Sequence, residues 1–254
     1  MKFDGIIFDW AGTTVDYGCM APVKAFIEAF EEYGITPTLE EVRKPMGMLK
    51  IDHVRTMLSM DRIAAEWKKQ HAREWNEDDV NAVYRLSEHK ILQIVENYAD
   101  PKPYVVETVA KLREMGMKIG STTGYTDEMM NLVVPNAEKA GYAPDCWYSP
   151  DSTDKMGRPY PYMIFRNMEQ LKLGDVRRIM KVGDTVADIK EGKNAGAVSV
   201  GILEGSSVIG LSQEEYEALS EAEKQAVCEK AEKTYREAGA DYVVKDIRGI
   251  LELL

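Results

Sequence analysis

The chain is poor in cysteine, in long apolar runs and in positive charge. Its three cysteines are odd in number, widely spaced and never arranged as CxxC (Cys19, Cys146 and Cys228), so we expect reduced thiols in a cytoplasmic protein. No run of about 18 apolar residues occurs, which argues against a membrane-spanning helix. The opening stretch "MKFDGIIFDW" is too short and too acidic for a signal peptide. We therefore expect a cytosolic protein with no membrane partner.

Basic residues are outnumbered, with 32 Lys and Arg against 43 Asp and Glu, giving a net charge of -11. A surface of this sign repels the phosphate backbone of nucleic acid and anionic membranes, so nucleic acid is not an expected partner. The 254 residues, of which 44% are hydrophobic, can bury one large core or one core with a smaller appended domain.

Short runs rich in Ile and Val predict buried strands that alternate with helices. The strands are expected at residues 5–8, 118–121, 179–182, 198–202 and 241–244, and helical patterns cover residues 105–115 and 162–171. This alternation predicts βαβ units, and hence an α/β fold with a doubly wound parallel sheet. Near the C-terminus, the charged residues 213–237 predict one solvated helix that ends at Gly239.

The stretch between residues 19 and 99 interrupts the alternation. It has helical spacing at Val23, Phe26, Ile27 and Phe30 and no convincing strand, so we expect a helical cap domain inserted after the first strand. Two prolines in "NYADPKPYV" mark the return to the sheet. The predicted domains are an α/β core (1–18 and 100–254) and a helical cap (19–99).

Polar residues gather where the predicted strands end. Asp9 follows the first strand, Thr123 and Gly124 follow the second, Asp184 follows the third, and Arg158 lies in "GRPYP". Because ligands bind at the carboxyl ends of the strands in a doubly wound sheet, we expect these residues to share one site. A carboxylate, a hydroxyl and a cation, with further carboxylates beside them, suit a phosphoryl group held next to a hard cation.

The expected cation is Mg²⁺, which takes oxygen ligands and keeps several waters. Asp9, the carbonyl of Ala11 and Asp184 would suffice as ligands, and Asp188, four residues after Asp184, could hold a metal-bound water. Gly12 is at least a turn former between these residues.

These motifs, in this order and around a helical insertion, resemble the haloacid dehalogenase superfamily of phosphoryl-transfer enzymes. The similarity spans essentially the whole chain. More narrowly, "DWAGTTVDYG", "RKPMGMLKIDHVR", "GSTTGYT", "GRPYP" and "KVGDTV" resemble the branch that hydrolyses phosphonoacetaldehyde to acetaldehyde and phosphate. The resemblance implies a Rossmann-like core and a homodimer formed through the cap domain.

Residue roles follow from the same resemblance. Asp9 would be the nucleophile that forms a phosphoaspartyl intermediate, and Lys50 would form an imine (Schiff base) with the aldehyde. Thr123 and Arg158 would hold the phosphonate, Arg158 standing where most members have lysine. The substrate-binding residues would also include Gly12, Gly124 and Met46.

The alanine at position 11 fits this chemistry. Phosphatase loops usually carry a second carboxylate there, which protonates an oxygen leaving group, whereas expulsion of carbon needs an electron sink such as a protonated imine. A carboxylate at Ala11 would pair with the Lys50 ammonium and stabilise its unreactive form. The mechanism therefore requires a depressed pKa of Lys50. If residues 50–53 are helical, His53 shares a face with Lys50 and could shuttle protons.

Two other interpretations remain open from the sequence. A phosphomonoesterase or phosphomutase would use the same Asp9, but it would want an acid near Ala11. A catalytically dead member serving as a binding module would be expected to lose Asp9 or Asp184, and this chain keeps both.

Overall fold

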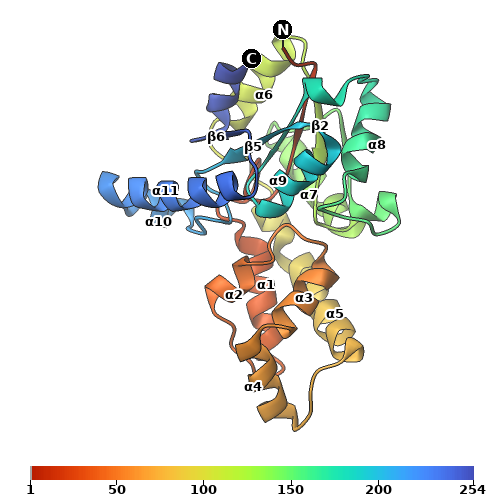
Figure 1. Ribbon diagram of the computed structural model, residues 1–254, viewed down its shortest axis with the longest axis vertical. Helices are drawn as coiled ribbons and strands as arrows, with labels where there is room; N and C mark the ends of the chain where they lie inside the picture. Colours follow the sequence, from red (N-terminus) through yellow and green to blue (C-terminus); the bar gives the residue numbers. More distant parts are fainter. Residues whose placement is uncertain (1) are drawn as a thin grey trace.

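The computed structural model describes residues 2–254, with a parallel sheet between two layers of helices and further helices attached at one end (Figure 1). The six strands are parallel and follow the order β3-β2-β1-β4-β5-β6. They are β1 (Gly5–Phe8), β2 (Lys118–Thr122), β3 (Cys146–Tyr148), β4 (Ile179–Gly183), β5 (Val198–Ile202) and β6 (Tyr242–Val244). The predicted α/β doubly wound sheet is confirmed.

Strand β1 lies in the middle of the sheet and is buried on both faces. Ile6 and Phe8 join the large core cluster that includes the helices α6 (Val105–Glu114) and α7 (Asp127–Lys139). Ile7 points the other way and joins a smaller cluster beside α8 (Tyr162–Leu171) and α9 (Val186–Ala195), since successive side chains alternate between faces. The strand order reverses between β1 and β4, so the carboxyl end of β1 lies at the topological switch point where ligands bind.

The strand predictions agree with the structure to within one residue at each end, but β3 was missed. This strand has three residues, all only partly buried, at the edge of the sheet. The apolar run that identifies a central strand is therefore absent from it. Short 3-10 segments complete the core: η2 (Pro150–Thr153), η3 (Val176–Arg178) and η4 (Ile247–Leu253).

The secondary structure of residues 19–99 is helical, with loops between the helices and no strand, as expected. The elements are α1 (Met20–Glu31), α2 (Leu39–Arg43), α3 (Lys50–Leu58), α4 (Asp61–His71), α5 (Glu77–Ile94) and η1 (Val95–Tyr98). They surround a hydrophobic cluster of their own, with Phe26, Phe30 and Trp67 fully buried or nearly so. Figure 1 shows these helices together beyond one end of the sheet. We keep the name cap for residues 19–99, and its boundaries stay a prediction.

The single helix predicted over residues 213–237 is wrong. The structure has two helices, α10 (Gln213–Ala218) and α11 (Glu221–Glu237). Leu219 between them is extended, and Ser220 begins a new helix with a capping box in which its hydroxyl accepts from the Glu223 amide. Because such a side chain satisfies the free amides of a first turn, it favours a new start over a continuous helix.

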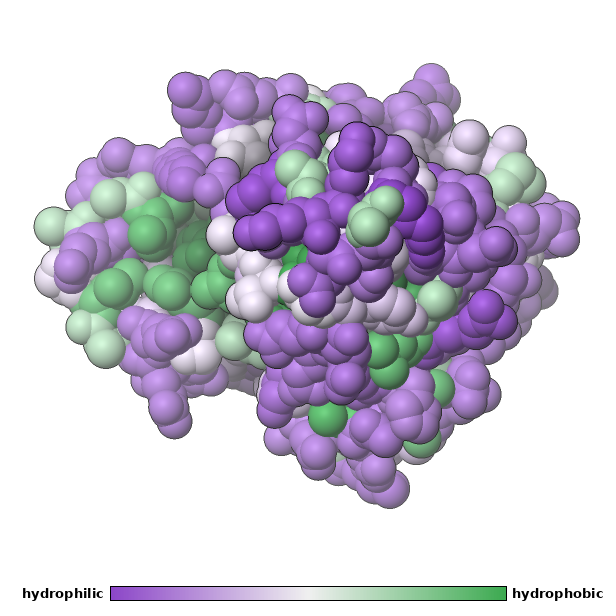
Figure 2. Space-filling model, turned by 90° about the horizontal axis from the view of Figure 1, so that it is seen from below, coloured by the Kyte–Doolittle hydropathy of each residue, from purple (hydrophilic) through white to green (hydrophobic). Residues whose placement is uncertain are grey.

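The surface at the cap end is mostly hydrophilic. In Figure 2, which looks onto that end, hydrophobic residues gather on the left, the side on which α10 and α11 lie in Figure 1. Within residues 2–254, no helix is both long and apolar enough to span a bilayer. The three cysteines are free.

Candidate active site

A cavity at the carboxyl ends of β1 and β2 is lined by both the core and the cap. The core provides Asp9, Ala11, Thr123, Gly124, Tyr125, Arg158 and Thr185, and the cap provides Cys19, Met46, Gly47 and Lys50. Most of the predicted site residues thus line one cavity. Four do not line it: Asp184 and Asp188 lie next to Asp9, Gly12 packs against Asp184, and His53 lies one turn after Lys50 in α3. Cys19, Gly47, Tyr125 and Thr185 were not anticipated as cavity residues.

Three buried carboxylates form a cluster at this cavity. Asp9, Asp184 and Asp188 each offer an oxygen, and these atoms lie within 4.8 Å of one another. Burial, together with the charges of Asp9 and Asp188, raises the pKa of Asp184 to about 8. Several negative charges buried close together are unfavourable without a compensating cation. The three carboxylates therefore suit a hard divalent cation that takes oxygen ligands. The fit agrees with the predicted ligands Asp9 and Asp184, and the Ala11 residue lines the same cavity.

The turn after Asp9 is shaped around Asp184. Gly12 has a φ of +86°, and a Cβ there would lie 2.1 Å from Asp184 Oδ2, so only glycine fits. The Thr13 hydroxyl donates to Asp184 Oδ1 at 3.1 Å, and the Ser207 amide donates to Asp184 Oδ2 at 2.7 Å. Gly12 is therefore more than a turn former, because it lets the two loops approach.

Arg158 reaches the nucleophile candidate directly. Its Nη2 donates to Asp9 Oδ1 at 2.6 Å, and its Nη1 lies 3.1 Å from Asp188 Oδ1. Although burial disfavours the charged form, Asp188, Asp9 and Glu191 hold the pKa of the guanidinium above its ordinary value. The arrangement keeps a permanent cation beside Asp9, where an incoming anion would meet it.

Lys50 is brought to the same cavity by the first turn of α3. Its side chain is buried, and Nζ lies 5.0 Å from the centre of the Tyr125 ring. Burial, helped by the charge of Arg158, lowers the pKa of Lys50. The direction is the one that imine chemistry requires, because only the free amine attacks a carbonyl.

His53 shares the buried face of α3 with Lys50, as predicted. Its ring stacks on Phe26 with centroids 4.0 Å apart, and neither ring nitrogen has a hydrogen-bond partner among the described residues. Burial and the charge of Lys50 hold the pKa of His53 well below its usual value. The imidazole is therefore neutral, with one nitrogen able to accept a proton.

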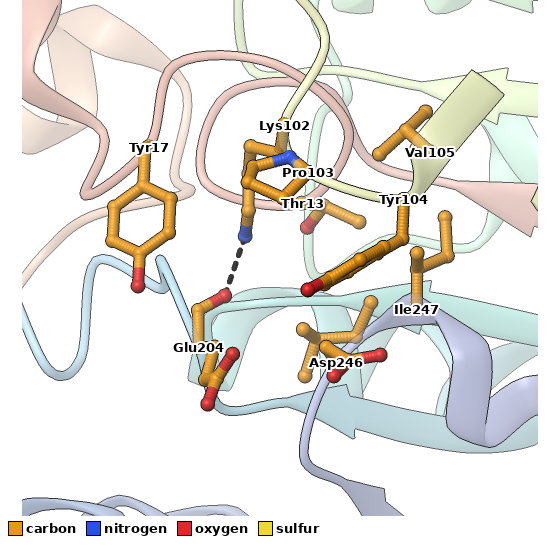
Figure 3. A pocket seen from close by; sticks show the side chains of 10 residues that line it. Thr13, Tyr17, Lys102, Pro103, Tyr104, Val105, Glu204, Asp246 and Ile247 are labelled. Atoms are coloured by element: carbon orange, nitrogen blue, oxygen red, sulfur yellow. Dashed lines mark hydrogen bonds between the residues drawn. The ribbon is translucent and has the colours of Figure 1, made fainter. Parts of the chain in front are cut away.

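Lys102 is a buried cation that the sequence did not point to. Its Nζ donates to the carbonyls of Gly12 and Glu204, the second at 2.7 Å, and lies 5.4 Å from the Tyr17 ring centre. Figure 3 shows its side chain pointing toward Glu204, near Tyr17, in a pocket that Thr13 also lines. Burial lowers its pKa to about 8. In the sequence, its place between Pro101 and Pro103 indicates only the return of the chain to the sheet.

Comparison with known families agrees with this geometry. The haloacid dehalogenase-like hydrolase family matches residues 3–196, and a HAD-hydrolase-like family matches residues 155–249. The fold and the site are those of a hydrolase with a doubly wound core. The chain belongs to the haloacid dehalogenase-like hydrolase family and is an enzyme.

Individual relatives match over nearly the full length. A phosphonoacetaldehyde hydrolase from Lysinibacillus sphaericus is 50% identical over 98% of this chain and 93% of its own. One from Bacillus cereus is 44% identical over 100% of this chain and 96% of its own. The crystal structure of a phosphonoacetaldehyde hydrolase-like protein from Oleispira antarctica superposes with a TM-score of 0.95 and 36% identity, covering 100% of this chain and 91% of that one. The resemblance drawn from the motifs is confirmed.

Proposed function

We propose that this enzyme hydrolyses the carbon–phosphorus bond of phosphonoacetaldehyde to acetaldehyde and phosphate. The observation that carries the proposal is the buried Lys50 amine in the cavity that also holds Asp9, with a methyl group at Ala11 instead of an acid. The names of the full-length relatives support the same substrate. An oxygen-ester phosphatase has no use for a buried lysine of lowered pKa at this position.

The phosphonate end of the substrate would be held by the core. Arg158 provides the cation. Thr123 lines the cavity, and its hydroxyl, which accepts a hydrogen bond from the Tyr125 amide, can still donate its own proton to the phosphonate. Gly12 and Gly124 have no side chain, so their loops can lie close to Asp184 and to the cap, respectively. Met46 from the cap would provide an apolar contact to the substrate. Asp9, Asp184 and the Ala11 carbonyl would hold Mg²⁺, with Asp188 nearby. When bound, the metal neutralises charge on the phosphonate and on these carboxylates.

Imine formation comes first. The free amine of Lys50 adds to the aldehyde carbon, and loss of water leaves a protonated imine on Nζ. We assign to the neutral His53, which shares a face of α3 with Lys50, the acceptance and return of a proton through water during this dehydration.

Asp9 then attacks phosphorus. Its carboxylate forms the new oxygen–phosphorus bond while the carbon–phosphorus electron pair moves into the protonated imine, which becomes a neutral enamine on Lys50. Protonation at carbon and hydrolysis release acetaldehyde and restore the amine. Water hydrolyses the phosphoaspartyl group to phosphate. Cap closure would exclude water in the first half and opening would admit it in the second.

The test is reductive trapping. Borohydride added with phosphonoacetaldehyde should inactivate the enzyme and leave a secondary amine on Lys50, located by peptide mapping, because the imine is the intermediate that borohydride converts to a stable amine. Borohydride without substrate should cause no loss. Lys50→Arg keeps the charge but should neither cleave the substrate nor be trapped.

Two results would overturn the assignment. An adduct on another lysine, or full activity in Lys50→Arg, would show that Lys50 is not the electron sink. Failure to release phosphate or acetaldehyde from phosphonoacetaldehyde, together with release of phosphate from an oxygen monoester in the presence of Mg²⁺, would identify a phosphatase instead. We also propose that the core comprises residues 1–18 and 100–254 and the cap residues 19–99, that the enzyme forms a homodimer through the cap, and that it is cytoplasmic.

A further inference from the structure

Arg158 is held from behind by two buried charges that the reaction scheme does not use. Its Nε donates to Glu191 Oε2 at 3.0 Å, and the Nζ of Lys181 lies 3.4 Å from the same oxygen. Both side chains have no exposed surface. Glu191 lies on α9, one turn after Asp188, and Lys181 lies on β4, so the pair is anchored in the centre of the core.

Each nitrogen of the Arg158 guanidinium contacts a different carboxylate. The Nε edge meets Glu191, Nη1 meets Asp188, and Nη2 alone meets Asp9. Nη2 also donates to the carbonyl and the hydroxyl of Thr122, both at 2.8 Å, and that hydroxyl donates in turn to Glu191 Oε2 at 3.0 Å. Glu191 therefore acts on Arg158 both directly and through Thr122.

A buried arginine without a partner at Nε can turn about its long side chain, and a different edge would then face Asp9. Glu191 prevents this, since it is the acceptor of the Nε proton. A buried carboxylate is unfavourable unless a cation lies beside it, and Lys181, which also contacts Asp188 at 2.7 Å, provides that cation. A fold that needed only packing would be served by apolar residues at these two positions.

We propose that Glu191, supported by Lys181, is a positioning residue that directs the Nη2 edge of Arg158 toward Asp9 and the anion bound there. The inference rests on the proposed function only for the identity of that anion. Neither residue lines the cavity, so the effect of Glu191 should appear through Arg158, whereas Lys181 also contacts Asp188.

The experiment compares Glu191→Gln with Lys190→Met, an exposed neighbour on the same helix. Inorganic phosphate is titrated into each Mg²⁺-loaded protein by calorimetry, and kcat and KM are measured with phosphonoacetaldehyde. We expect Glu191→Gln to weaken phosphate binding and lower kcat/KM by about 10- to 100-fold, as loss of an orienting partner does at comparable sites. Lys190→Met should behave as the parent enzyme. Unchanged phosphate affinity and kcat/KM in folded Glu191→Gln would overturn the proposal.

A double-mutant cycle shows whether Glu191 acts through Arg158. In an Arg158→Lys background, Glu191→Gln should have little further effect on phosphate affinity, because the edge it orients is gone. Equal losses in both backgrounds would contradict a positioning role. Reductive trapping on Lys50 should persist in Glu191→Gln.

A variant that fails to fold does not end the test. Lys181→Met with Glu191→Leu removes both charges together, which buried ion pairs commonly tolerate, and should fold while binding phosphate more weakly. Retained phosphate affinity in this folded double variant would contradict the proposal. Phosphate binding does not require cleavage of a phosphonate. If the parent enzyme failed to cleave phosphonoacetaldehyde while Glu191→Gln still weakened phosphate binding, the proposed substrate would be refuted and the positioning role of Glu191 would stand.

Discussion

The methyl group of Ala11 lines the same cavity as the Lys50 amine. A carboxylate placed there would add a negative charge close to a lysine whose pKa burial has lowered. We predict that Ala11→Asp raises the pKa of Lys50 and suppresses carbon–phosphorus cleavage at pH 7, by about tenfold for each unit of pKa. Ala11→Asn, similar in size but uncharged, is the matched control. The pH profile of kcat should move to higher pH in Ala11→Asp only, and an unmoved profile would make the empty position incidental.

The carboxylate cluster couples Mg²⁺ binding to protons. With a pKa of about 8, Asp184 is mostly protonated at pH 7 in the metal-free enzyme, whereas a metal ligand must be ionised. Mg²⁺ binding at pH 7 should therefore release about one proton per ion, and the affinity should rise as the pH rises to 8 and beyond. Calorimetry in buffers of different ionisation enthalpy measures the release. A binding enthalpy that is the same in every buffer at pH 7 would contradict the prediction.

Single residues differ in how readily the sequence identifies them. Asp9 and Asp184 stand in short motifs directly after β1 and β4, so their shared place follows from the topology of a parallel sheet. Arg158 lies in the loop between η2 and α8, and its place beside Asp9 depends on how that loop folds. Lys102 and Glu191 stand in no such motif. Each is one charged residue among many in the sequence. The role of Lys102 depends on Gly12, 90 residues away, and that of Glu191 depends on Arg158, 33 residues away. Buried charges of this kind require the structure.

At the scale of elements, α1 begins on an unusual cap. Asp16 accepts from the amides of Met20 at 2.8 Å and Ala21 at 3.1 Å. Burial outweighs these hydrogen bonds and raises the pKa of Asp16 to about 7, from an ordinary 3.8. The Asp16 carboxyl therefore resists ionisation at the point where the chain enters the cap.

The sign of the resulting pH dependence follows from linkage. Between pH 3.8 and about 7 the folded protein holds a proton on Asp16 that the unfolded chain has lost, so the stability from this group is full below 3.8 and declines up to about 7. We predict that the metal-free enzyme loses stability relative to Asp16→Asn across this window, by on the order of 4 kcal/mol. Urea unfolding of both proteins at several pH values measures the difference, and a difference that does not change with pH would refute it.

A strand or helix could be predicted from the sequence where its hydrophobic pattern alone distinguished it. The central strands are short, buried runs rich in Ile and Val, and each was identified. The edge strand β3 is short and half-exposed, and the break at Leu219 and Ser220 depends on a capping box inside a uniformly charged stretch. Periodicity detects burial, so it fails where a strand or a helix end is defined by hydrogen bonds instead.

At the scale of the whole molecule, the cap meets the core through glycines. Gly47 in the cap has a φ of +85°, and a Cβ there would lie 2.4 Å from Thr185 Oγ1 of the core. Gly124 of the core would place a Cβ 3.1 Å from the Met48 carbonyl of the cap. The two parts touch almost backbone to backbone around the cavity.

Gly47→Ala should therefore keep the cap from seating. The added methyl costs about 1–2 kcal/mol in backbone strain alone, and moving the cap away relieves the clash with Thr185 without unfolding. We expect kcat/KM to fall by at least about tenfold, while the melting temperature falls no further than in a control variant with the same backbone strain. Gly141→Ala, with a φ of +100° but only Val106 nearby, is the control and should cost stability without costing activity. Equal activity in the two variants would exclude a seating role for Gly47.

The chain leaves the sheet and returns to it through neighbouring segments. Val15 and Pro101 form an antiparallel bridge, and the Lys102 amide donates to the Thr14 carbonyl at 2.8 Å. Everything between these points is one continuous piece of sequence. Lys50 lies inside that piece, whereas Ala11, Asp9 and the other carboxylates of the cluster lie outside it. Exchange of that one piece could therefore remove or introduce the lysine proposed to form the imine while the residues proposed to handle phosphorus are inherited unchanged, but position 11 would have to change separately.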